Sequence, residues 1–349
     1  MTNLVQVQES SHLDESSLFY QPSQEIFFEV AGRRFRIDSR DEWSARAVSR
    51  ILEMLALRIV PSDGRKPDCT LRISCGLQIP KIPSELDRFD VADGICYTNG
   101  NSLYIDLDGS LVVVGSSRES GVDVWIRKQY EDSSWLLSQL ISQALAAAMR
   151  RCGLFLLHAA GVRAPGDDMA ILIAGDSGAG KSTITFQLAS FGWGYLSDDV
   201  LLLSKGANGT EVRGLRRFFA LTADTLAAVE LQTRSELALM GMPKRRLIPE
   251  ELFPAGQIEL AFPGAIIFPS ITKESQSRIQ RLSVFETMTR LLRLDPWSCF
   301  DKATANQHLN FFANLARETV GFELQAGKDL LGNPALTAEL VGSVNVPVR

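Results

Sequence analysis

The chain has 349 residues, of which 45% are hydrophobic and 22% charged, with a formal net charge of −5. This composition is typical of a globular protein with a sizeable core, and it argues against nucleic acid or an anionic membrane as the main partner. The five cysteines form no CxxC pair and the three histidines are scattered, which argues against a structural zinc site. No signal peptide or membrane-spanning run is recognisable, so we expect a cytoplasmic protein.

The N-terminal third divides into a tail and a mixed module. Residues 1–24 are polar and rich in Ser, Gln and Glu, and we expect a flexible tail. Residues 25–132 alternate short strand patterns with one amphipathic helix pattern over 40–57, and NGN and DG turns separate the later strands. We therefore predict an N-terminal α+β module. It carries no chemical motif, so recognition domain and scaffold are both open interpretations.

A second domain is predicted over residues 133–349. It begins with a helix over 133–153, which belongs to this domain or bridges the two. Strands over 154–163 and 169–174, a helix over 181–191 and a strand over 194–204 follow. Hairpin turns lie among the helices, so we predict an α/β fold with a mixed sheet rather than a purely parallel one.

The stretch GDSGAGKS matches the phosphate-loop pattern G-x-x-x-x-G-K-[ST] and lies between an apolar strand and a helix. Its glycines, Gly175, Gly178 and Gly180, are expected to turn with positive φ and let backbone N–H groups approach a phosphate. Lys181 would reach the β- and γ-phosphates of ATP, and the Ser182 hydroxyl would bind Mg²⁺. The predicted nucleotide-binding residues are Gly175, Asp176, Ser177, Gly178, Ala179, Gly180, Lys181, Ser182 and Thr183.

Two adjacent acids, Asp198 and Asp199, follow the loop after only one helix and a turn. They should lie on the strand that returns beside the loop. Neighbouring strand residues face opposite sides, so at most one acid faces a transferred phosphate unless the strand bulges there. We expect Asp198 to be a general base for an attacking hydroxyl and Asp199 to contact the metal. The alternative is a pair of exposed turn acids.

The combination of GDSGAGKS, SDDV, LLHAAGV and TEVRGLRRF resembles the catalytic domain of HPr kinase/phosphorylase, over roughly residues 153–265. The resemblance implies a fold shared with phosphoenolpyruvate carboxykinase. It also implies Mg²⁺-dependent transfer of the γ-phosphate of ATP to a hydroxyl, with a serine of a peptide or small protein as acceptor. It further implies His158 as an active-site partner and Glu211 as a second metal contact. A core histidine is the alternative interpretation of His158.

One family element, PVRPGRN, has no clear counterpart in this chain. GMPKRRLIPEELFP occupies an analogous place and offers Lys244, Arg245 and Arg246, of which Arg245 is the predicted catalytic cation. A solvated basic run is the alternative. The stretch FFALTADTLAAV resembles lasso-peptide tailoring kinases, which act on a serine hydroxyl. A small-metabolite phosphotransferase and a nucleotide-binding regulator without transfer are the competing functions, and a homo-oligomer is left open.

Overall fold

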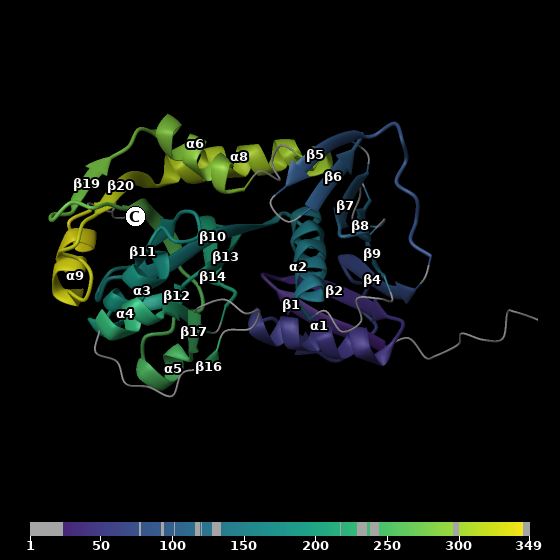
Figure 1. Ribbon diagram of the computed structural model, residues 1–349, viewed down its shortest axis with the longest axis horizontal. Coiled ribbons are helices and arrows are strands. Elements are labelled where there is room, and N and C mark those ends of the chain that lie inside the picture. The colour runs from purple at the N-terminus through teal and green to yellow at the C-terminus, as the bar shows by residue number, and fades with distance from the viewer. Residues whose placement is uncertain are drawn as a thin grey trace, which may run out of the picture.

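Two mixed β-sheets and a smaller third sheet carry the fold in the computed structural model of the protein (Figure 1). The structure describes residues 24–76, 78–91, 94–100, 102–115, 119, 121–127, 134–216, 218–228, 236–237, 244–295 and 300–344. The predicted flexible tail therefore lies outside the described residues, apart from the residue that begins the first strand.

The first sheet has nine strands in the order β3-β1-β2-β4-β9-β8-β7-β6-β5. Strand β4 pairs in parallel with β2 and β9, and the other pairs are antiparallel. The elements are β1 (Gln24–Val30), β2 (Arg33–Ser39), α1 (Glu42–Met54), β3 (Arg58–Val60), β4 (Cys69–Gly76), β5 (Asp87–Val91), β6 (Gly94–Thr98), β7 (Leu103–Leu107), β8 (Ser110–Val114) and β9 (Val122–Arg127).

Helix α1 forms where the sequence supplies both a cap and an apolar stripe. The Asp41 side chain accepts a hydrogen bond of 2.7 Å from the backbone N–H of Ser44, which satisfies a donor at the helix start. Val48, Ile51 and Leu52 recur at helical spacing and are buried against the first sheet. The predicted α+β character of this module is thus present in the structure.

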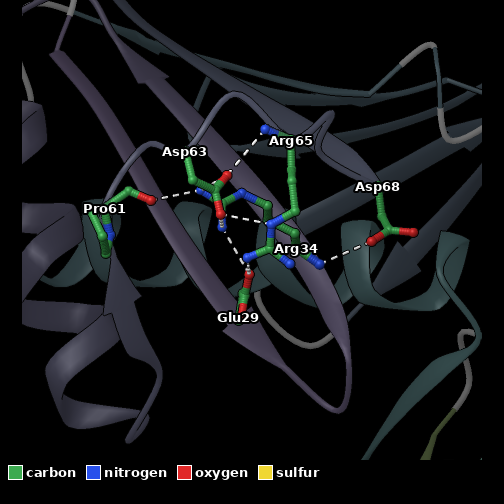
Figure 2. Close-up of polar contacts among 6 residues, drawn as sticks. All are labelled: Glu29, Arg34, Pro61, Asp63, Arg65 and Asp68. Carbon is green, nitrogen blue, oxygen red and sulfur yellow. Dashed lines mark hydrogen bonds and ion pairs between the residues drawn. The ribbon is translucent and has the colours of Figure 1, made fainter.

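A closed charge network ties the β1–β2 hairpin to the loop that precedes β4 (Figure 2). The buried Arg34 guanidinium pairs with Glu29 at 2.8 Å and with Asp63 at 3.1 Å. Arg65 binds the same two carboxylates, at 2.7 and 2.6 Å. The backbone N–H of Arg34 donates to Asp68 at 2.9 Å. These acids and arginines are matched to one another, so the network holds a loop in place and leaves little charge for a ligand.

The second sheet has eight strands, seven of them in the order β14-β13-β10-β11-β18-β20-β19, and β12 also pairs with β10. Strands β11, β18 and β20 are mutually parallel, and the remaining pairs are antiparallel. The sheet strands are β10 (Leu154–Arg163), β11 (Met169–Ala174), β12 (Gly194–Ser197), β13 (Val200–Gly206), β14 (Gly209–Gly214), β18 (Phe262–Ile271), β19 (Arg278–Arg281) and β20 (Val320–Ala326).

Helices cover both faces of this sheet. The buried side chains of β10 alternate between two apolar clusters, with Phe155 and Leu157 in one and Ala160 and Val162 in the other. Near-continuous apolar strands are typical of a sheet covered on both sides. The helices of this part are α3 (Lys181–Ser190), α6 (Val284–Leu294), α8 (Lys302–Glu318) and α9 (Pro334–Gly342). The predicted mixed α/β class is confirmed at this level.

The third sheet, β15-β17-β16, lies beside the second one and carries two short helices. Its elements are β15 (Phe219–Thr222), α4 (Ala223–Ala228), β16 (Glu236–Leu237), β17 (Lys244–Leu247) and α5 (Pro249–Leu252). Its apolar side packs on α3, where Phe186, Phe219 and Leu247 share one core cluster.

Helix α2 (Ser134–Arg151) stands between the two large sheets (Figure 1). Its apolar residues, from Leu136 to Met149, belong to the core of the first sheet. At its end, Arg150 and Arg151 pair with the buried Asp301, next to α8, at 3.1 and 2.6 Å. The boundary near residue 132 stays a prediction: it places α2 in the second domain, whereas the apolar residues of α2 pack in the core of the first sheet. The helix is a bridge between the two.

Among the described residues, no helix combines the length and the apolar character needed to cross a lipid bilayer.

Candidate functional site

The glycine-rich loop joins the buried strand β11 to helix α3, as the sequence predicts. Gly178 and Gly180 adopt left-handed backbone conformations, with φ of 86° and 98°, which side chains with a Cβ rarely adopt. Gly175 does not share this conformation, so the prediction of a positive φ there is wrong. A Cβ at Gly175 would lie 3.2 Å from that of Ala179. Glycine at this position instead permits close packing inside the loop.

Lys181 is the first residue of α3, and its side chain folds back over the loop. It is only 4% exposed, and its Nζ donates hydrogen bonds to the carbonyl oxygens of Gly175 at 2.7 Å and Asp176 at 3.0 Å. Burial lowers the pKa of Lys181, while the Asp199 carboxylate acts in the opposite direction. The ammonium group is thus held at the loop by neutral carbonyl acceptors, which an anionic ligand can replace.

Strand β10 brings the loop, His158 and the two aspartates together. On one edge Ala159 lies opposite Ala174, the last residue before the loop. On the other edge His158 lies opposite Val200, the first residue of β13. The two aspartates occupy the bend between β12 and β13. The predicted strand over 194–204 is therefore divided at the two acids, and both of its parts pair with β10 rather than with β11, the strand that leads into the loop.

The two neighbouring acids lie in different environments. Asp198 is 0% exposed, and its Oδ2 accepts a hydrogen bond of 2.9 Å from the backbone N–H of Ala220. Burial raises the pKa of Asp198, and Arg216 opposes this shift. Asp199 has a side chain that is 18% exposed, and it lines the pocket described below. The Asp198 carboxylate is enclosed and Asp199 is the accessible acid, so this arrangement favours Asp199 over Asp198 as the acid that faces the pocket.

Asp199 contacts two partners, one on each oxygen. Its Oδ1 lies 3.3 Å from Nε2 of His158, and its Oδ2 lies 2.6 Å from Nη1 of Arg216. Burial lowers the pKa of His158, and the Asp199 carboxylate only partly offsets this. The imidazole is therefore largely neutral at pH 7 and can orient Asp199 without adding a full positive charge. The structure brings His158 into the predicted site.

A pocket of about 340 Å³ opens where α3, the third sheet and the end of the second sheet meet. Ala220, Thr222 and Asp224 line it from β15 and α4, and Ile271, Leu330 and Leu331 line it from the end of β18 and the segment after β20. The hydroxyl groups of Thr183 and Thr225 lie 2.9 Å apart and join α3 to α4. Most of the predicted loop residues line the pocket, namely Ser177, Gly178, Gly180, Lys181, Ser182 and Thr183, whereas Gly175, Asp176 and Ala179 do not.

Of the three cations in KRRL, the structure brings Lys244 rather than Arg245 to the pocket. Alternate residues of β17 face opposite sides, so Lys244 lies on the pocket side and Arg245 is exposed on the other. Arg246 lies with its guanidinium carbon 4.6 Å over the ring of Phe218. The assignment of Arg245 as the catalytic cation does not match this arrangement, because it is one strand position away from the face that the site uses.

Glu211 lies outside the pocket. It stands opposite Ser204 on the β13–β14 ladder, four positions beyond the start of β13, and pairs with Arg213 at 3.0 Å. Its implied contact with the same metal as Asp199 therefore has no counterpart in the described arrangement. Within the described residues, no group of three or more His, Cys, Asp or Glu side chains is arranged to hold a metal ion.

Arg216 is a site residue that the sequence reasoning missed. It lies between β14 and β15, contacts both aspartates, and its guanidinium carbon is 4.9 Å over the ring of Phe218. The signal was present in the run TEVRGLRRF, where a basic pair follows a strand directly. Pattern reasoning offered no reason to prefer it over a solvated cation.

The arrangement defines a class in coarse terms: a mixed α/β protein whose glycine-rich loop, between β11 and α3, shares a pocket with an accessible aspartate. No protein-family model matches the chain, and no curated protein matches it either. Among solved structures, the chain is similar to one described as "Structure of the Hpr(Ser) kinase/phosphatase from Coxiella burnetii". The match has 14% identity, a TM-score of 0.30, and covers 54% of this chain and 93% of that one. Similarity of this degree does not assign the chain to a family.

Proposed function

We propose that this chain is an ATP-dependent phosphotransferase that transfers the γ-phosphate to a hydroxyl, with a serine of a peptide or small protein as the acceptor. One observation carries the proposal: Asp199, flanked by His158, opens into the same pocket as the loop that carries Lys181. A loop that binds phosphate and an acid that accepts a proton are the two parts that hydroxyl phosphorylation requires.

Asp199 is the general base of this proposal. It accepts the proton of the acceptor hydroxyl while the bond from that oxygen to the γ-phosphorus forms and the bond to the leaving oxygen of ADP breaks. His158 holds one carboxylate oxygen in place at 3.3 Å. Lys181 leaves its two carbonyl acceptors and binds phosphate oxygens, and Lys244 also lines the pocket. Both cations stabilise negative charge during transfer.

The oxygen groups near the loop suit Mg²⁺. Ser182 and Asp199 line the pocket, and the buried Oδ1 of Asp198 has no hydrogen-bond partner among the described residues. Magnesium prefers oxygen donors and is usually held by one or two carboxylates together with substrate phosphates. Two acids and one hydroxyl are therefore a sufficient protein contribution. When bound, the ion neutralises charge on the phosphates.

The apolar side of the pocket supports a nucleotide as the phosphate donor. Ile271 and Leu331 line it although they are 68% and 55% exposed. Exposed aliphatic side chains beside a phosphate loop offer a surface for a planar base. The donor would then lie with its base against Ile271 and its terminal phosphate near Asp199.

The test combines binding with transfer. The purified chain is incubated with Mg²⁺, γ-labelled ATP and serine-containing peptides, including those encoded by neighbouring genes, and phosphorylated sites are located by mass spectrometry. We expect labelled peptide from the wild type and none from Lys181→Ala. Label on a low-mass acceptor alone would indicate a small-metabolite phosphotransferase. ATP binding without transfer to any hydroxyl would indicate a nucleotide-binding regulator and would refute the proposal.

A further inference from the structure

Arg216 places one positive charge between two carboxylates. Its Nη1 lies 2.6 Å from Oδ2 of Asp199 and 3.9 Å from Oδ1 of Asp198. The second of these oxygens is fully buried and has no hydrogen-bond partner among the described residues, although the Ser182 side chain lies close enough to this carboxylate to act against the rise of its pKa. An orphaned, enclosed carboxylate oxygen that faces the same cation as its neighbour marks a place built to hold positive charge.

The other oxygens of the two acids already have partners. Oδ1 of Asp199 lies beside His158 and is the oxygen that accepts the hydroxyl proton in the proposed reaction, and Oδ2 of Asp198 accepts from the backbone of Ala220. Only the two oxygens that face Arg216 are thus open to a different cation. A divalent ion bound there would need the oxygen that Arg216 now occupies, and it would meet a like charge at contact distance.

Phe218 offers Arg216 support that does not depend on the acids. The guanidinium carbon lies 4.9 Å over this ring, within the range of a cation–π contact. The Arg216 side chain is 24% exposed, so its charge also has access to water. Arg216 can therefore give up Asp199 without leaving a buried, unpaired charge.

We propose that Arg216 is a built-in counter-ion that occupies the cation position of the Asp198–Asp199 pair and must leave Asp199 before a divalent metal can bind. The free protein then takes up metal poorly, and metal enters together with the nucleotide phosphates. This inference rests on the proposed function for the identity of the metal, but its central claim concerns the protein without nucleotide. Arg216 acts through the two acids and is a positioning residue.

The experiment is a Mn²⁺ titration of the nucleotide-free protein, with the free ion followed by electron paramagnetic resonance. Arg216→Gln removes the competing charge and should tighten Mn²⁺ binding by at least about tenfold. Arg216→Lys keeps the charge and should stay close to the wild type. Arg213→Gln is the matched control, because Arg213 comes from the same segment but pairs with Glu211 outside the pocket. In the double variant Arg216→Gln/Asp199→Asn, the gained affinity should disappear.

Unchanged or weaker Mn²⁺ binding by folded Arg216→Gln would overturn the proposal. Circular dichroism and thermal unfolding establish that each variant is folded. If Arg216→Gln does not fold, Mn²⁺ binding by the wild type still tests the proposal. Saturable binding well below about 1 mM without nucleotide would contradict a site blocked by arginine. The titration contains no ATP, so it can succeed where phosphoryl transfer fails, and the reverse outcome is equally distinguishable.

Discussion

Asp301, at the junction between the two large sheets, and Asp198, beside the pocket, are both buried. Their negative charges are compensated to different degrees by neighbouring arginines. Asp301 binds Arg150 at 3.1 Å and Arg151 at 2.6 Å. Burial raises its pKa, yet the two arginines outweigh burial and the net pKa is lowered. Asp198 has one arginine at 3.9 Å, and burial dominates, so its pKa is raised. One region completes its charge pairs and the other leaves them incomplete.

The difference distinguishes charged groups that hold the fold together from charged groups that are available to a ligand. The junction resembles the Arg34 network of the first sheet, where acids and arginines satisfy one another at close range (Figure 2). In such clusters each carboxylate is paired with an arginine, so little negative charge is left for a cationic ligand. Around the pocket, Lys181 is held by carbonyl oxygens and one oxygen of Asp198 has no hydrogen-bond partner among the described residues. Incompletely matched charge in a pocket is typical of a binding or catalytic site.

The largest expected effect is on activity. Asp199→Asn removes the accessible base, so we expect phosphoryl transfer to fall by about 10²–10⁴-fold while nucleotide binding persists. Transfer is measured with labelled ATP and binding by calorimetry. Glu211→Gln is the control, because its carboxylate pairs with Arg213 outside the pocket. Full phosphoryl transfer by Asp199→Asn would mean that another group is the general base.

The next effect is on stability and concerns the junction. Asp301→Asn leaves two buried arginines without their carboxylate and should lower the free energy of unfolding by about 3–5 kcal/mol. Denaturant unfolding measures it. The control is Asp87→Asn, whose carboxylate pairs with Lys302 at 3.6 Å on the surface and should cost less than about 1 kcal/mol. Similar losses of unfolding free energy in both variants would show that the buried ion pairs of Asp301 stabilise the protein no more than the surface pair does.

The pH dependence of stability should have opposite signs in the two regions. Because the pKa of Asp198 is raised, the contribution of this residue to the free energy of unfolding is fully present below the ordinary value of 3.8. It is lost as pH rises through the raised pKa. Because the pKa of Asp301 is lowered, its contribution is present above 3.8 and is lost as pH falls through the lowered value. Unfolding of metal-free Asp198→Asn across pH should therefore show a smaller decline above pH 3.8 than the wild type. Identical pH profiles of stability for the wild type and Asp198→Asn would contradict a raised pKa of Asp198 in the folded protein.

The smallest effect tests the loop itself. Gly180 has a φ of 98°, so Gly180→Ala should cost about 1–2 kcal/mol of stability through backbone strain. Gly76→Ala is the control, because an added Cβ there meets nothing within 4 Å and its φ is not in the left-handed region. Thermal unfolding compares the two variants. Equal changes would mean that the loop glycine is free of conformational strain.

Local patterns predicted most of the elements that carry the site. The motif from Gly175 to Ser182, with an apolar strand before it and a helical run after it, gives the strand, loop and helix seen in the structure. Neither the orientation of Asp198 and Asp199 nor that of Lys244 and Arg245 could be predicted. In each pair, two adjacent polar residues lie in a short strand or bend, and only long-range pairing decides which one faces the pocket.

The mixed α/β class, the glycine loop and the position of the acid pair one helix and a turn after that loop followed from local spacing, whereas His158 was implied by the family resemblance alone. Only the tertiary structure decided that Asp198 is enclosed, that Asp199 is accessible, and that Arg216 lies between them. Contacts between β10, β13 and the segment before β15 set these positions, and they join residues far apart in the chain. The burial and partners of a charge depend on such contacts, and they decide its chemistry.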